Sequence, residues 1–271
     1  MHRDATVTIL VKASPALTAD LVEAMCVAGV ECNPDPRWIR LFTVPFRHLE
    51  DEARFVKYQQ VGLRVRRPGG DRRPESWTPD VDSIRLGRTI GTGHGWSERR
   101  GLVAGLGEHT MCELIALNES GSGPGVPSLG VVRPVSPPEV VIEARDQEQI
   151  AKWTERADAI ARQRTLFDRG IPRPRLEIVP WRFKYRYRCL EPRCRGHAQT
   201  IVDWELVALW LKVCHRSDWR DAVRAKFVDE LWSPERDSVV FVGNQHQRPG
   251  SFLVLGVFWP PRQSLQTALD V

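Results

Sequence analysis

The sequence predicts an α+β fold with a β-rich first half and a mixed α/β second half. Short apolar runs lie close together in the first third of the chain, between turns rich in proline and glycine. This pattern favours a small barrel or sandwich over alternating strands and helices. Beyond residue 145, segments of helical periodicity alternate with apolar strands. We therefore divide the chain into a β-rich region, 1–145, and a basic α+β region, 146–271.

Four runs in the first 70 residues are expected to be strands, and residues 140–143 are expected to form another. Residues 6–11, 24–30 and 38–44 are apolar, and residues 33–36 supply a proline-rich turn between the second and the third. Residues 61–67 alternate apolar and basic side chains, as a strand with one buried face does.

The second region contains three predicted helices and three predicted strands. Residues 147–169 carry Ile150, Trp153, Ala157 and Ile160 at helical spacing. A second helix is expected to begin after Asp203, a favourable N-cap, and a third to cover 219–231. The strands are expected at 176–187, 239–242 and 252–259.

Composition restricts the compartment and the type of partner. The net charge of +5 is uneven, because residues 1–144 carry 17 basic and 18 acidic side chains whereas residues 145–271 carry 22 and 16. An anionic partner is therefore expected to meet the second region. No apolar run approaches the roughly 20 residues that span a bilayer, and the N-terminus lacks a signal-peptide pattern. We expect a cytoplasmic protein with no membrane partner, whose six cysteines are reduced thiols or metal ligands.

The spacing of Cys189, Cys194 and His197 predicts a zinc knuckle. Two thiolates and an imidazole in a C-x4-C-x2-H pattern suit a tetrahedral ion, and Gly196 fits the tight turn that such a loop needs. The candidates for a fourth ligand are Cys214, His215 and His246. The alternative is two ordinary thiols near a surface histidine. The cysteines of the first region are expected to pack in its apolar core: Cys26, Cys32 and Cys112.

A row of basic residues precedes and enters this knuckle. Residues 181–188 alternate aromatic and basic side chains, so a strand here presents aromatic rings on one face and cations on the other. The cations would contact nucleic-acid phosphates. In the plainer alternative, the aromatic face is buried in the core and the basic face is solvated. The predicted phosphate-binding residues are Arg182, Lys184, Arg186, Arg188, Arg193 and Arg195.

Asp203 and Glu205 are the candidates for catalysis. Carboxylates near a basic groove are typical of metal-dependent nucleases, in which they hold Mg²⁺, and His197 would be a third participant. Two residues apart on a helix, however, the carboxylates do not share a face. Helix capping by Asp203 explains the same residues without catalysis.

Two polar loops are further candidates for ligand contacts. Residues 69–77 mix charge with turn formers and suit either a second phosphate contact or a salt-bridged loop. Residues 243–249 place polar groups between two apolar strands, which suits a ligand-contacting loop or an ordinary hairpin connection.

Three short motifs of the first region form a recognisable set. Residues 25–30 read Met-Cys-Val-Ala-Gly-Val, residues 38–41 read Trp-Ile-Arg-Leu, and residues 129–134 read Leu-Gly-Val-Val-Arg-Pro. This set resembles the dual OB-containing domain of prokaryotic conflict systems. Leu41 stands where the family has proline. The resemblance implies two small OB-type barrels within 1–145, a class that often binds single-stranded nucleic acid. It carries over no catalytic residue and does not reach the second region.

Together these observations predict a nucleic-acid-binding protein that is a component of a bacterial antiviral defence or DNA-processing system, with other protein subunits as further partners. One alternative is a metal-dependent nuclease. Another is a scaffold whose exposed tryptophans anchor protein partners.

Overall fold

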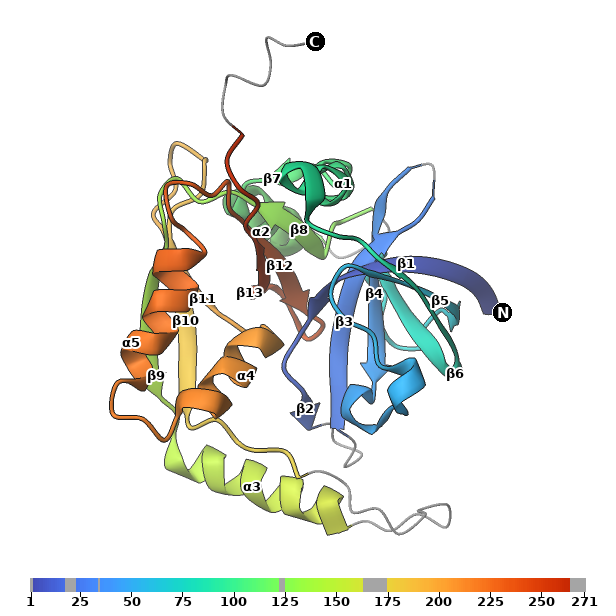
Figure 1. Cartoon of the computed structure of the whole chain (residues 1–271), viewed down its shortest axis with the longest axis horizontal. Helices are drawn as coiled ribbons and strands as arrows, with labels where there is room; N and C mark the ends of the chain where they lie inside the picture. Colours follow the sequence, from blue (N-terminus) through green and yellow to red (C-terminus); the bar gives the residue numbers. More distant parts are fainter. Residues whose placement is uncertain (1, 18–22, 34, 122–124, 163–174, 264–271) are drawn as a thin grey trace.

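The first part of the chain forms a closed five-stranded barrel. The computed structural model describes residues 2–17, 23–33, 35–121, 125–162 and 175–263 (Figure 1). The barrel order is β1-β5-β6-β4-β3, and β1 closes it by pairing with β3 as well as β5. The fourth strand in chain order returns to lie beside the first, which is a Greek key. This confirms the OB-like small barrel. Its strands are β1 (His2–Lys12), β3 (Glu23–Glu31), β4 (Arg37–Val44), β5 (Gln59–Arg66) and β6 (Ser76–Thr89), with β2 (Ala16–Leu17) beside β3.

The alternation of inward and outward side chains along the strands, together with Gly29, determines how the barrel packs. In β5, Val61 and Val65 point into the core while Arg64 faces outward, as the sequence pattern predicts. Gly29 in β3 lies against β1 so closely that a Cβ atom there would be 2.1 Å from the carbonyl oxygen of Thr8. Only glycine permits this approach of the two backbones.

Residues 90–144 do not build the second barrel that the motif resemblance implies. Their strands pair instead with strands from the end of the chain. A four-stranded sheet has the order β13-β12-β8-β7, and a three-stranded sheet has the order β11-β10-β9. In Figure 1 the four-stranded sheet lies between the barrel and the three-stranded sheet. The strands are β7 (Glu108–His109), β8 (Leu129–Val132), β9 (Glu139–Ala144), β10 (Trp181–Tyr187), β11 (His197–Thr200), β12 (Val239–Gln245) and β13 (Arg248–Phe258).

The expected helices of the second region are present. Asp203 caps α4, because its Oδ1 accepts a hydrogen bond from the backbone N–H of Glu205 at 3.0 Å. The ring of Trp219 in α5 lies 5.2 Å from that of Trp181, so α5 packs on the aromatic face of β10. Residues 163–169 of the first predicted helix lie outside the described residues. The helices are α1 (Gly93–Ala104), α2 (Met111–Ser120), α3 (Gln147–Arg162), α4 (Trp204–Val213) and α5 (Trp219–Arg224), which continues as a π-helical turn (Ala225–Glu230). In the described part of the chain, none of the helices has the length and apolar character needed to cross a membrane.

A buried core and a buried arginine join the barrel to the four-stranded sheet. Val11 and Tyr58 of the barrel region share one apolar cluster with Phe241 and other residues of the sheet. Arg40, 2% exposed, extends from β4 and donates to the hydroxyl and the carbonyl oxygen of Ser128, both at 2.9 Å. The barrel is therefore continuous in its packing with the rest of the molecule.

Candidate metal centre

Four potential metal ligands converge at the end of the three-stranded sheet. The ligand atoms of Cys112, Cys189, Cys194 and His197 all lie within 4.8 Å of one another. The shortest separations are 3.2 Å from Cys194 Sγ to His197 Nε2 and 3.5 Å from Cys112 Sγ to the same nitrogen. This Cys3His set is compatible with Zn²⁺, which structural sites hold with four such ligands in tetrahedral geometry.

Two tight local structures position these ligands. Thr110 and Glu113 form a capping box at the start of α2, which fixes the turn that carries Cys112. In the loop after β10, the N–H of Cys194 donates to the carbonyl of Glu191 at 2.9 Å. Gly196 then adopts a φ of +102°, so that β11 begins at His197.

The surroundings of the cluster set the protonation of its members. Burial together with the neighbouring thiols raises the pKa of Cys112 to about 12. Burial also acts to raise the pKa of Cys189, but hydrogen bonds from the backbone N–H groups of Cys112 and Glu191 outweigh it, so that pKa is lowered. Burial lowers the pKa of His197, which favours the neutral imidazole that binds metals.

The fourth member of the cluster differs from all three predicted candidates. Cys112, expected to be a core thiol, supplies it. Cys214 is exposed at the end of α4, with its Sγ 3.6 Å from the carbonyl of Leu211, and His215 is also exposed. His246 Nδ1 lies 3.4 Å from a carboxylate oxygen of Asp71. Local spacing gave no signal for Cys112, because 77 residues separate it from Cys189.

The predicted basic residues extend along the outer face of β10 and into the knuckle. Phe183, Tyr185 and Tyr187 are buried on the opposite face, so the aromatic rings belong to the core. Because these three rings are buried, they are not available for base stacking, and Trp181 on the same face is half-buried. We call the six cations the basic row: Arg182, Lys184, Arg186, Arg188, Arg193 and Arg195.

Part of the basic row is neutralised by the neighbouring strand. Lys184 forms an ion pair with Glu143 at 2.7 Å, and Arg186 forms one with Glu139 at 3.3 Å. Arg188 donates to the carbonyl of Cys194 at 3.0 Å. Within the described residues, Arg182, Arg193 and Arg195 have no carboxylate at ion-pair distance, and the last two are exposed. The excess positive charge therefore lies at the two ends of the row, at Arg182 and in the knuckle loop.

The carboxylates proposed for nuclease chemistry are engaged by a lysine of the barrel region. Lys57 Nζ lies 3.1 Å from both carboxylate oxygens of Asp203 and 3.1 Å from Glu205 Oε2. Burial acts to lower the pKa of Lys57, but the charges of Asp203 and Glu205 raise it above its usual value. Asp203 therefore has a structural role as helix cap and ion-pair partner. All ten tryptophans are buried or half-buried, so the exposed anchors that the scaffold alternative needs are absent.

Two family models match the chain. A domain of unknown function, DUF8757, matches residues 107–270, and a second domain of unknown function, DUF8758, matches residues 3–105. A search of curated proteins finds no match.

Proposed function

The chain belongs to the family of the domain of unknown function DUF8757, and we propose that it binds nucleic acid through the basic row. The observation that carries the proposal is the line of cations from β10 into the knuckle loop. Within the described residues, Arg193 and Arg195 at the loop end and Arg182 at the start of β10 have no carboxylate at ion-pair distance. Alternate residues of a strand lie about 7 Å apart, which suits contacts to successive phosphates.

The contacts would be to the sugar–phosphate backbone. Because Phe183, Tyr185 and Tyr187 are buried, the row offers charge without stacking surfaces. Binding of this kind depends strongly on salt and little on base sequence. The closed OB-like barrel supports the proposal, because that fold class includes many nucleic-acid binders.

We further propose that Cys112, Cys189, Cys194 and His197 hold a structural Zn²⁺. Four protein ligands complete a tetrahedral shell and leave no position for a substrate, which is typical of structural zinc. The ion would fix the loop that carries Arg193 and Arg195 relative to β10. In this arrangement the metal supports binding by placing cations.

The experiment compares two matched double variants. Fluorescence anisotropy with labelled single- and double-stranded DNA and RNA is measured between about 50 and 200 mM salt. Arg193→Ala/Arg195→Ala is expected to weaken binding and to reduce the log–log salt slope by about 0.7–0.9 for each phosphate that is no longer neutralised. The control, Lys212→Ala/Arg224→Ala, removes two exposed cations from α4 and α5, and α5 packs on the other face of β10. Equal affinity and slope for the two variants would contradict the proposal.

A further inference from the structure

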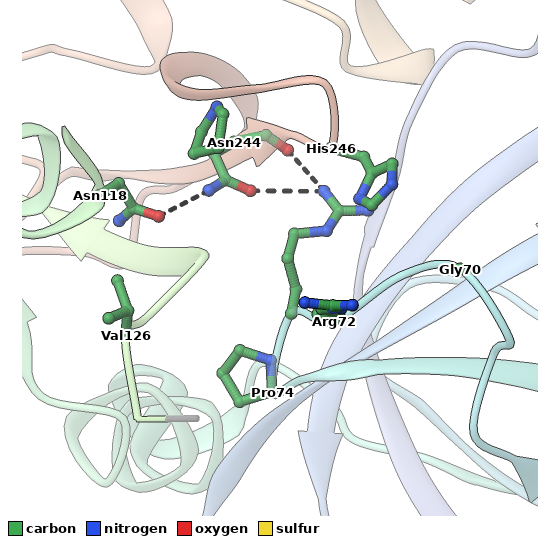
Figure 2. Close-up of a pocket in the computed structure, with 9 residues that line it drawn as sticks. Gly70, Arg72, Pro74, Asn118, Val126, Asn244 and His246 are labelled. Carbon is green, nitrogen blue, oxygen red and sulfur yellow. Dashed lines mark hydrogen bonds between the residues drawn. The ribbon is translucent and has the colours of Figure 1, made fainter. Parts of the chain in front are cut away.

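A pocket of about 210 Å³ lies where the barrel meets the C-terminal sheet (Figure 2). Three segments that are distant in sequence line it: residues 70–74 of the barrel region, Asn118 with Val126, and residues from Asn244 to Pro249. The first and the third are the two polar loops that the sequence marks as candidates for ligand contacts. The fold brings them to the same pocket.

Two asparagines in the wall of the pocket are fixed in orientation. Asn118 and Asn244 are 7% and 6% exposed, and Asn244 Nδ2 donates to Asn118 Oδ1 at 2.8 Å. Asn118 Nδ2 donates to the carbonyl oxygens of Leu114 and Pro127, both at 2.9 Å. Figure 2 shows the two amides linked to each other. Asn244 Oδ1 also accepts a hydrogen bond from Arg73 Nη1 at 3.3 Å.

The fixed amides keep hydrogen-bonding capacity for a ligand. An amide oxygen has two acceptor positions and an amide nitrogen has two donors. The hydrogen bonds above leave one acceptor position on Asn118 Oδ1 and one donor on Asn244 Nδ2. An adjacent donor and acceptor on asparagine side chains is the pattern that pairs with the edge of a nucleobase.

The pocket also has an unpaired cation. Asp71 neutralises Arg73 at 2.6 Å and lies 3.4 Å from His246. Although burial acts to raise the pKa of Asp71, hydrogen bonds from Arg73 hold it well below its usual range. Arg72 lines the same pocket, is exposed, and has no carboxylate at ion-pair distance in the described part of the chain. A free guanidinium of this kind is suited to a phosphate group.

We propose that this pocket binds a single nucleoside monophosphate, with the base edge at Asn118 and Asn244 and the phosphate at Arg72. The pocket is smaller than the roughly 300–1,000 Å³ typical of drug-sized ligands, which limits the ligand to about one nucleotide. Pro74, Val126 and Pro249 provide apolar walls for a planar ring. The nucleotide is either free or the phosphorylated end of a strand. No residue of the basic row lines the pocket, so this inference stands apart from the proposed function.

Calorimetric titration of the full-length protein tests the inference. The four common nucleoside 5′-monophosphates, the matching nucleosides and inorganic phosphate are titrated separately. At least one monophosphate is expected to bind about tenfold or more tightly than its nucleoside and than phosphate, because it makes both sets of contacts. Absence of binding by every monophosphate, or equal affinity for the matching nucleoside, would overturn the inference.

Variants of Arg72 test the assigned contact. Arg72→Ala is expected to weaken monophosphate binding by about tenfold or more, and Arg72→Lys by less, because lysine keeps the charge but loses the planar fork. Arg224→Ala, an exposed arginine on α5, is the control and is expected to bind like the wild type. Unchanged binding by Arg72→Ala would refute the assignment. Because Arg72 makes no ion pair among the described residues, thermal unfolding of this variant should match the wild type.

A second titration identifies the source of the nucleotide. Short single-stranded oligonucleotides with and without a 5′-phosphate are compared on the Arg193→Ala/Arg195→Ala background, in which the basic row is weakened. A preference for the phosphate that Arg72→Ala abolishes assigns the pocket to strand ends, whereas binding of the free monophosphate alone assigns it to a free nucleotide. If the proposed function is wrong, Arg193→Ala/Arg195→Ala will bind nucleic acid as the wild type does. If this inference is wrong, Arg72→Ala will bind the monophosphate as the wild type does.

Discussion

Replacing Lys57 with methionine is expected to destabilise the protein by about 3–5 kcal/mol. The side chains of Lys57 and Asp203 are 12% and 3% exposed, and Lys57 Nζ contacts both carboxylate oxygens at 3.1 Å. Without the amine, Asp203 keeps one donor, the N–H of Glu205, for a charge that stays buried. The penalty of an unpaired buried carboxylate therefore determines the magnitude. The exposed Glu205 contributes little to it.

Thermal unfolding followed by far-UV circular dichroism measures this effect. A loss of about 3–5 kcal/mol corresponds to a fall in Tm of about 6–20 °C for a chain of this size. The measurement belongs near neutral pH. The pKa of Lys57 is raised in the folded protein. The contribution of Lys57 to folding stability is therefore fully present below the ordinary lysine pKa of about 10.4, and it is lost only as the pH rises above that value.

Two further variants separate the buried charge from general effects of substitution. Lys57→Met/Asp203→Asn removes both charges but keeps an amide oxygen that still caps α4, so it should recover most of the lost stability. Lys152→Met removes a surface lysine that pairs with Glu148 one helical turn away, and should change stability by less than about 0.5 kcal/mol. The reasoning is refuted if Lys57→Met melts within about 2 °C of the wild type, or if the double variant is no more stable than Lys57→Met alone.

Three other predictions concern single sites. Cys112→Ser should lower the zinc content of the purified protein, as measured by elemental analysis, whereas Cys214→Ser should not; equal zinc in both would contradict the Cys3His assignment. Gly29→Ala should destabilise the barrel by about 1–3 kcal/mol or more in urea unfolding, because the new methyl group overlaps the carbonyl of Thr8, and an unchanged midpoint would show that the two strands separate without cost. Because the pKa of Asp71 is lowered in the folded protein, the contribution of this carboxylate to folding stability is present above about pH 4 and is lost as the pH falls. The wild type should therefore lose more stability than Asp71→Asn between about pH 5 and pH 2, and parallel pH profiles would refute this.

Where one face of a strand or helix is buried, the local sequence pattern was sufficient to predict the element and its buried face. The alternation in residues 61–67 and 181–187 reflects side chains that point alternately into the core and outward, so β5 and β10 were predictable with their faces. Asp203 was predictable as a helix cap because capping is a contact between near neighbours in sequence.

The remaining features depend on contacts between distant parts of the chain. Periodicity cannot reveal that Lys57 meets Asp203 across 146 residues, or that Cys112 joins the predicted zinc knuckle. For the same reason the sequence does not show that β8 pairs with β12, which is why the motif resemblance led to a second barrel. A role in bacterial antiviral defence or DNA processing depends on that resemblance alone and stays a prediction.

The buried contact between Arg40 and Ser128 has a consequence for dividing this protein. The two family models meet near residue 106, yet Arg40 lies in the region matched by one model and Ser128 in the region matched by the other. Expressed alone, the first region would lose the hydrogen-bond acceptors of Arg40 and would expose the apolar surface around Val11 and Tyr58. A break at the boundary between the two models would cut through a single cooperative unit, so the two regions should be inherited, expressed and unfolded together.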